Sequence, residues 1–156
     1  MHVIDLGAVQ QLVASWWFDY DQGRFDAFPE YFTADARFTC RSDSGQTAFE
    51  EFVTADVRGR DELVSWQVEH RSNSPYPLRH NGTNVHLAAS RVGEADFRSY
   101  LFVTQIVDGA VSNLSTGVCT GTVRVEDGAL RLAALHVVLD FTTSEVFSTA
   151  TRHPLV

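Results

Sequence analysis

Four long segments rich in β-branched and aromatic residues occupy the second half of the chain. They span residues 78–91, 96–107, 111–125 and 130–143. Val92-Gly93-Glu94 separates the first two, and Asp108-Gly109 and Asp127-Gly128 separate the others. The two Asp-Gly pairs are strong hairpin signals, because the turns of such hairpins need residues that tolerate positive φ. The sequence therefore predicts a four-stranded antiparallel meander, and a meander of this length twists and curves.

The first half of the chain has the residue spacing of helices. Asp5 can cap a helix that runs to about Tyr20, in which apolar residues recur every three to four positions, and Gly23 can end it. The remaining predicted elements are a short helix over 27–32, a strand over 36–41, a helical turn near 48–53 and a helix over 59–70. We expect the tail from residue 144 onward to form a short helix or an arm.

Helices followed by strands indicate an α+β fold. We predict a single domain over residues 1–156, with helices in about 5–32 and 59–71 and the strand meander in about 78–143. The N-terminal helices should pack on the concave face of a cone-shaped antiparallel sheet. A pocket between the two layers follows from that shape.

Composition narrows the classes of partner. The net charge of −8 disfavours nucleic acid and anionic membrane surfaces as partners. No segment approaches the roughly 20 apolar residues of a membrane span, and the N-terminus lacks a secretory signal, so we expect a cytoplasmic protein. The aromatic share is 12%, with 11 Phe, which suits the walls of an apolar ligand cavity. We therefore expect an apolar small molecule as the ligand.

The sequence gives no sign of a metal site or a cofactor. It contains no CxxC and no HExxH pattern, and its histidines are scattered. We expect Cys40 and Cys119, both in predicted strands, to be small buried residues that can line the pocket. Nothing beside either cysteine would lower the pKa of its thiol, so neither is predicted to be a nucleophile.

Asp21 and His80 are the strongest candidates for chemistry. Asp21 ends the first helix and His80 begins the strand-rich half, so each can lie on the wall of the pocket. A carboxylate that accepts a proton from one imidazole nitrogen fixes the tautomer, and the other nitrogen can then take and return protons. Tyr20 can donate to a ligand oxygen. The alternatives are a solvent-facing Asp21, a strand histidine bonded to backbone or solvent, and a tyrosine at the edge of the core.

Further residues are candidates for ligand binding. Trp17, Trp66 and Phe102 are predicted wall residues, with plain core packing as the alternative. Tyr100 shares a strand face with Arg98 and can hold a ligand oxygen. Strand alternation leaves His136 facing either a polar region of the pocket or a subunit interface.

Three fragments of the sequence resemble the nuclear-transport-factor-2-like superfamily, in its SnoaL-like branch. They are Asp19-Tyr20-Asp21-Gln22-Gly23-Arg24-Phe25-Asp26 with Phe32-Thr33-Ala34-Asp35-Ala36, Leu78-Arg79-His80-Asn81-Gly82-Thr83-Asn84, and Glu126-Asp127-Gly128-Ala129-Leu130-Arg131-Leu132. That branch contains polyketide cyclases, scytalone dehydratase and bile-acid dehydratase. The resemblance implies a cone-shaped fold, a pocket with catalytic Asp21, His80 and Tyr20, and assembly as a homodimer or homotrimer.

Three functions are compatible with these observations. The first is a cofactor-free dehydratase, isomerase or cyclase that acts on an apolar polycyclic or aromatic molecule. The second is a binding module that carries or senses such a molecule. The third is an accessory subunit that pairs through its sheet, which the resemblance suggests because small dioxygenase subunits share the superfamily.

Overall fold

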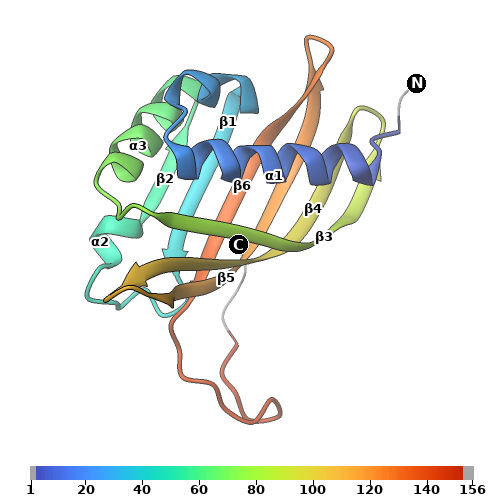
Figure 1. Cartoon of the computed structure of the whole chain (residues 1–156). Helices are drawn as coiled ribbons and strands as arrows, with labels where there is room; N and C mark the ends of the chain where they lie inside the picture. The colour runs from blue at the N-terminus through green and yellow to red at the C-terminus, as the bar shows by residue number, and fades with distance from the viewer. Residues whose placement is uncertain (1–2, 153–156) are drawn as a thin grey trace.

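The computed structural model describes residues 3–152 and shows one curved sheet with the helices on one side of it (Figure 1). The helical elements are α1 (Leu6–Gln22), the 3₁₀ helix η1 (Phe25–Tyr31), α2 (Glu50–Val53) and α3 (Arg60–Ser72). The strands are β1 (Phe32–Ser42), β2 (Ala55–Arg58), β3 (Leu78–Arg91), β4 (Glu94–Val107), β5 (Ala110–Glu126) and β6 (Ala129–Asp140). The predicted α+β class is confirmed.

The sheet differs from the prediction in strand number and in one pairing. It has six strands in the order β2-β1-β6-β5-β4-β3, and β1 runs parallel to β6 while every other pair is antiparallel. The meander β3 to β6 matches the prediction. The expectation of a wholly antiparallel sheet was wrong, because the β1–β6 pairing joins segments that are far apart in the sequence. The four-residue strand β2 is too short to show a periodicity.

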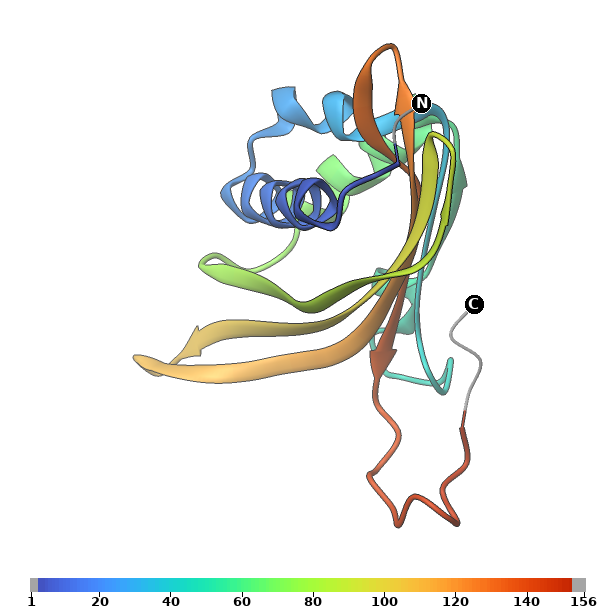
Figure 2. The ribbon, with the colours of Figure 1, turned by 90° about the vertical axis from the view of Figure 1, so that its right-hand side faces the viewer.

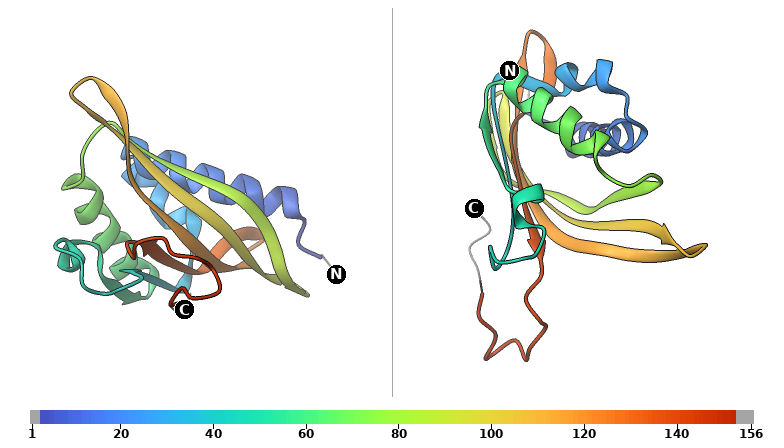
Figure 3. Two further views of the ribbon diagram at one scale, coloured as in Figure 1. Left: turned by 90° about the horizontal axis from the view of Figure 1, so that it is seen from below. Right: turned by 90° about the vertical axis from the view of Figure 1, so that its left-hand side faces the viewer.

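The helices lie on the concave side of the sheet. Figure 2 shows β3, β4 and β5 bending toward the side of the sheet on which α1 lies. Figure 3 shows the same arrangement from below and from the opposite side. α1 packs against β3, and α3 packs against β1. These two contacts place the end of α1, the end of α3 and the start of β3 next to one another.

Local signals explain the limits of α1. The side chain of Asp5 accepts a hydrogen bond from the backbone N–H of Ala8 at 3.1 Å, as an N-cap does. Gly23 ends the helix with φ of 62°, a conformation that favours glycine. The helix reaches Gln22, two residues beyond the prediction, so Asp21 belongs to its last turn.

β3 approaches α1 closely at one residue. A Cβ added to Gly82 would lie 3.1 Å from Cδ1 of Trp17, which is tighter than ordinary van der Waals contact. Glycine at this position therefore allows the backbone of β3 to approach the indole. The same approach places His80, two residues earlier on β3, beside α1.

The chain after β6 leaves the sheet as an irregular segment (Figure 3). The Asp43 carboxylate accepts hydrogen bonds from the backbone N–H groups of Phe141 and Thr142 and fixes its beginning. A single turn near 147–149 replaces the short helix that was one of the two expectations for this tail, and residues 153–156 lie outside the described part. Within residues 3–152, no helix is long and apolar enough to cross a membrane.

Candidate active site

An apolar cavity of about 320 Å³ lies between the helices and the sheet. All three tryptophans of the chain line it, together with aliphatic and aromatic residues of the central strands. Representative wall residues are Trp16, Trp17, Trp66, Phe38, Leu101 and Val137. A mainly apolar wall with several aromatic rings suits an apolar ring compound.

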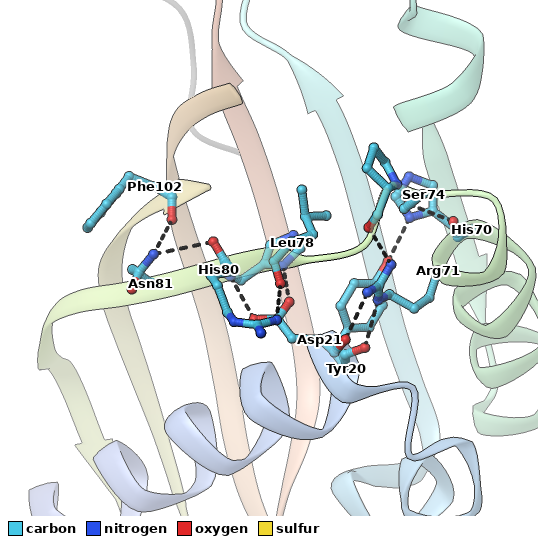
Figure 4. A network of polar contacts seen from close by, with 11 residues as sticks. Tyr20, Asp21, His70, Arg71, Ser74, Leu78, His80, Asn81 and Phe102 are labelled. Atoms are coloured by element: carbon cyan, nitrogen blue, oxygen red, sulfur yellow. Dashed lines mark hydrogen bonds and ion pairs between the residues drawn. The ribbon is translucent and has the colours of Figure 1, made fainter. Parts of the chain in front are cut away.

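Asp21 and His80 meet at the wall of this cavity (Figure 4). Oδ1 of Asp21 lies 2.5 Å from Nδ1 of His80, and Oδ2 accepts the backbone N–H of His80 at 2.8 Å. Both side chains are largely withdrawn from solvent, at 5% exposure for Asp21 and 12% for His80. One carboxylate therefore holds both the ring and the backbone of the same histidine. The other ring nitrogen, Nε2, has no hydrogen-bond partner within residues 3–152.

Aromatic rings fix the orientation of the imidazole. Trp17 is stacked on His80 with an interplanar angle of 5° and a centroid distance of 4.8 Å. Tyr20 meets the same ring edge-on, with centroids 5.3 Å apart. The Asp21 contact and these two rings together hold the imidazole in one orientation. A fixed ring orientation is what a proton-transfer group requires.

Arg71 joins the elements that carry the pair. Its buried guanidinium donates to the carbonyls of Tyr20 and Asp21, at 3.0 and 2.8 Å, and to the carbonyl of Pro75 at 3.0 Å. The first two carbonyls lie at the C-terminal end of α1, where helical partners run out, and the Tyr20 carbonyl also accepts the backbone N–H of Gly23 at 3.1 Å. The cation also offsets the unfavourable position of a carboxylate at a helix C-terminus. Asp21 is therefore a buried carboxylate at a helix end that Arg71 holds in place. It is not the solvent-facing side chain that was one of the alternatives.

His70 is a member of the site that the sequence did not single out. Its Nδ1 lies 2.6 Å from the hydroxyl of Tyr20, and its ring stacks between Phe52 and Trp66. Of the two polar groups, phenol is the stronger acid and imidazole the stronger base, so Tyr20 donates and His70 accepts. The proton of Tyr20 thus already has an acceptor, and the expectation that it points at a ligand is revised. The helical spacing of Trp66 and His70 was the one signal that could have indicated His70.

Burial keeps His70 neutral. Desolvation lowers the pKa of His70 from 6.5 to about 4, and the neighbouring His80 and Arg71 add to this effect. Desolvation also raises the pKa of Tyr20 well above its ordinary value. Tyr20 and His70 therefore form an uncharged hydrogen-bonded pair at neutral pH.

The lowered pKa of His70 predicts a loss of stability in acid. Between about pH 6.5 and pH 4, the unfolded chain binds a proton at His70 that the folded chain does not bind. The melting temperature of the wild-type protein should therefore fall as the pH falls through this window. A His70→Gln variant, which can still accept from Tyr20, should show a shallower decline, by several degrees at pH 4.5. Parallel slopes in thermal melts of the two proteins would contradict the prediction.

Three of the predicted binding residues lie on the outer face of the sheet, away from the cavity. Tyr100 is 59% exposed and Phe102 is 38% exposed. Side chains alternate between the two faces of β4, and the residues next to these two in the sequence are the ones that point inward. Nδ1 of His136 lies 2.7 Å from the hydroxyl of Thr39 on that outer face, while Val137 lines the cavity. Their predicted place in the pocket is therefore wrong. The alternative of an interface remains for His136.

Some of the remaining predicted wall residues line the cavity and one does not. Trp17, Trp66 and Cys40 line the cavity, whereas Cys119 is buried in the sheet and does not line it. Burial raises the pKa of both thiols to about 12, which agrees with their exclusion as nucleophiles. No group of three or more His, Cys, Asp or Glu residues placed to hold a metal ion occurs in the described part of the chain.

Comparison with known proteins shows the family to which the chain belongs. The model of the SnoaL-like domain matches residues 1–136, so the chain belongs to the SnoaL-like domain family. The resemblance inferred from the sequence is confirmed, and solved structures agree with the nuclear-transport-factor-2-like fold. No functionally curated protein matches the chain.

The solved structures that are similar to this chain belong to proteins that carry different functional names. One is a protein from Novosphingobium aromaticivorans, provisionally named a scytalone dehydratase, with 15% identity, a TM-score of 0.67, and coverage of 94% of this chain and 88% of its own. Another is the β subunit of benzoate 1,2-dioxygenase from Burkholderia mallei, with 22% identity, a TM-score of 0.68, and coverage of 89% and 93%. A third, from Catenulispora acidiphila in complex with S-DNPA, has 20% identity, a TM-score of 0.66, and coverage of 85% and 91%. At these identities the likeness establishes the fold.

Proposed function

We propose that this protein is a cofactor-free acid–base enzyme, a dehydratase, isomerase or cyclase, that acts on an apolar polycyclic or aromatic small molecule. The observation that carries the proposal is the contact between Asp21 and His80 at the wall of the apolar cavity. Asp21 holds the proton of the neutral imidazole on Nδ1, so Nε2 is the basic nitrogen. His80 is then the general base and acid, and Asp21 stabilises the imidazolium that forms.

The proposed reaction begins at a carbon next to a carbonyl. Nε2 of His80 takes a proton from that carbon, and the C–H electron pair forms an enolate. In a dehydration, the imidazolium returns the proton to a hydroxyl group β to the carbonyl, which leaves as water while a C=C bond forms. In an isomerisation, the proton returns to another carbon. In a cyclisation, the enolate carbon attacks a second carbonyl, and the resulting alkoxide takes the proton.

The cavity supports an apolar substrate with few polar groups. Its walls are mainly apolar and include several aromatic rings, and few polar side chains line it. Neutral His70, held by Tyr20, leaves His80 as the proton-transfer group of the site. We therefore assign Tyr20 a positioning role on His70.

A ligand carrier is the second candidate, because the same cavity could hold a molecule without converting it. The accessory-subunit hypothesis is supported by the dioxygenase β subunit among the similar structures. A subunit that acts only through its sheet has no need of a 320 Å³ cavity with a buried Asp–His pair in its wall. We therefore favour the enzyme.

The proposal also includes the oligomeric state of the protein and its location in the cell. We propose a cytoplasmic homodimer or homotrimer that associates through the outer face of the sheet. The exposure of Tyr100, Phe102 and Ile106 supports this interface, since large apolar residues on an open sheet face are commonly covered by a partner.

A turnover screen tests the proposed function. Polyketide, steroid and aromatic-diol compounds that carry a carbonyl are incubated with the wild-type protein and with the His80→Ala variant, and products are detected by mass spectrometry. We expect loss of water, or a change of structure at constant mass, with the wild-type protein only. Tight binding of these compounds without any conversion would instead identify a carrier, and equal conversion by both proteins would exclude His80.

A further inference from the structure

One polar side chain in the cavity wall has no hydrogen-bonding partner. Gln67 of α3 is 1% exposed and lines the cavity, and Oε1 of its amide is buried without a partner within residues 3–152. No hydrogen bond from its amide nitrogen occurs in that part of the chain either. An unpaired buried amide lowers the stability of the fold, because its hydrogen bonds to water are lost and not replaced. An apolar residue of similar size would pack at this position without that cost.

A second unpaired polar atom lies one helical turn further along α3. Nε2 of His70 is buried and has no hydrogen-bond partner among the described residues. Since Nδ1 of His70 accepts from Tyr20, Nε2 of the neutral ring carries the proton and is a donor. Gln67 and His70 are three residues apart on the helix, so they are neighbours on its surface, and both line the cavity.

The unpaired atoms of Gln67 and His70 lack opposite kinds of hydrogen-bond partner. Oε1 of Gln67 lacks a donor, and Nε2–H of His70 lacks an acceptor. A hydroxyl group supplies both, because it donates one hydrogen bond and accepts others. A bare hydrocarbon ring supplies neither and would leave both groups unpaired.

We propose that Gln67 and His70 form a hydroxyl-binding subsite on the α3 side of the cavity, distinct from the Asp21–His80 pair. The ligand is then an apolar ring compound with a hydroxyl group at the α3 end. The inference rests on the proposed function only in taking the cavity as the ligand site. Gln67 sets specificity, and the unpaired amide is the stability cost of a group kept for a ligand.

The test compares two probes that differ by one hydroxyl, 2-naphthol and naphthalene, by calorimetric titration. The wild-type protein should bind 2-naphthol at least about tenfold more tightly than naphthalene. In Gln67→Met, which keeps the length of the side chain, this preference should fall to about twofold or less, while naphthalene binds at least as well as before. In His80→Ala the preference should persist.

Thermal stability provides a second, independent readout. Removal of an unpaired buried amide should raise the melting temperature of Gln67→Met by a few degrees. Gln46→Met, at an exposed position between β1 and α2, is the matched control and should leave both stability and the hydroxyl preference unchanged.

The proposal would be overturned by a lower melting temperature of Gln67→Met, because the amide would then have a structural partner. It would equally be overturned by an unchanged preference in Gln67→Met, by no binding of 2-naphthol to the wild-type protein, or by loss of the preference in His80→Ala alone. Since the readout is binding, the proposed catalysis can fail in the turnover screen while the subsite stands, and the reverse also holds.

Discussion

Replacing His80 by alanine is expected to lower turnover by about 10²–10⁴-fold, the range that general acid–base groups contribute. The effect should fall on kcat more than on KM, because an apolar substrate binds mainly through the aromatic wall of the cavity. The Trp17 ring that stacks on the imidazole would lose its partner, but the cavity would remain. Steady-state kinetics on a substrate found in the screen measure both constants.

A His80→Gln variant is the matched control, because glutamine keeps polar atoms at this position but cannot transfer a proton at neutral pH. It should be as slow as His80→Ala. Recovery of most of the activity in His80→Gln would show that His80 only binds the substrate. Turnover within threefold of the wild-type value in both variants would remove the assignment of His80 as base.

Replacing Asp21 by asparagine is expected to reduce turnover by a similar factor, about 10²–10⁴-fold. The carboxylate uses both oxygens on His80, one for the ring and one for the backbone N–H. Asparagine has a single oxygen. If that oxygen keeps the backbone contact, the amide N–H₂ faces Nδ1 and shifts the proton of the imidazole to Nε2, so no base faces the substrate. If it keeps the ring contact, the N–H₂ group opposes the backbone N–H, and the fold loses stability.

Asp26→Asn, at an exposed position of η1, is the control for the same chemical change and should behave like the wild-type protein. The double variant of Asp21→Asn with His80→Ala should be no slower than His80→Ala alone, because the two residues act as one unit. Additive losses in the double variant would show that Asp21 acts independently of His80, which contradicts the proposed dyad.

Much of the fold could be predicted from local sequence signals. The two Asp-Gly turns and the cap at Asp5 gave the meander and the start of α1, because each depends on a few adjacent residues. The parallel pairing of β1 with β6 depends on how two distant segments pack, and no local pattern reports it. The length of β2 is set in the same way, by its antiparallel pairing with β1.

The site was only partly predictable. The contact between Asp21 and His80 could be expected, because a helix end and a strand start each carry an ionisable residue beside an apolar pattern. His70 and Gln67 were missed, because a polar residue in a helical segment has the same sequence pattern whether it is solvated or buried without a partner. Only the packed structure shows them to be enclosed by the cavity wall. Tyr100 and Phe102 were misplaced, because both faces of β4 carry apolar residues, so alternation alone did not reveal the inner face.

The tautomer of His80 is the most direct test, because proton transfer by this pair requires a proton on Nδ1 and a free Nε2. Nitrogen and proton NMR of protein labelled at histidine can report it, with His80→Ala used to assign the signal. We predict a His80 proton on Nδ1, strongly deshielded, that disappears in Asp21→Asn and persists in Asp26→Asn. A His80 ring that is protonated on Nε2, or that exchanges freely between tautomers in the wild-type protein, would contradict the account.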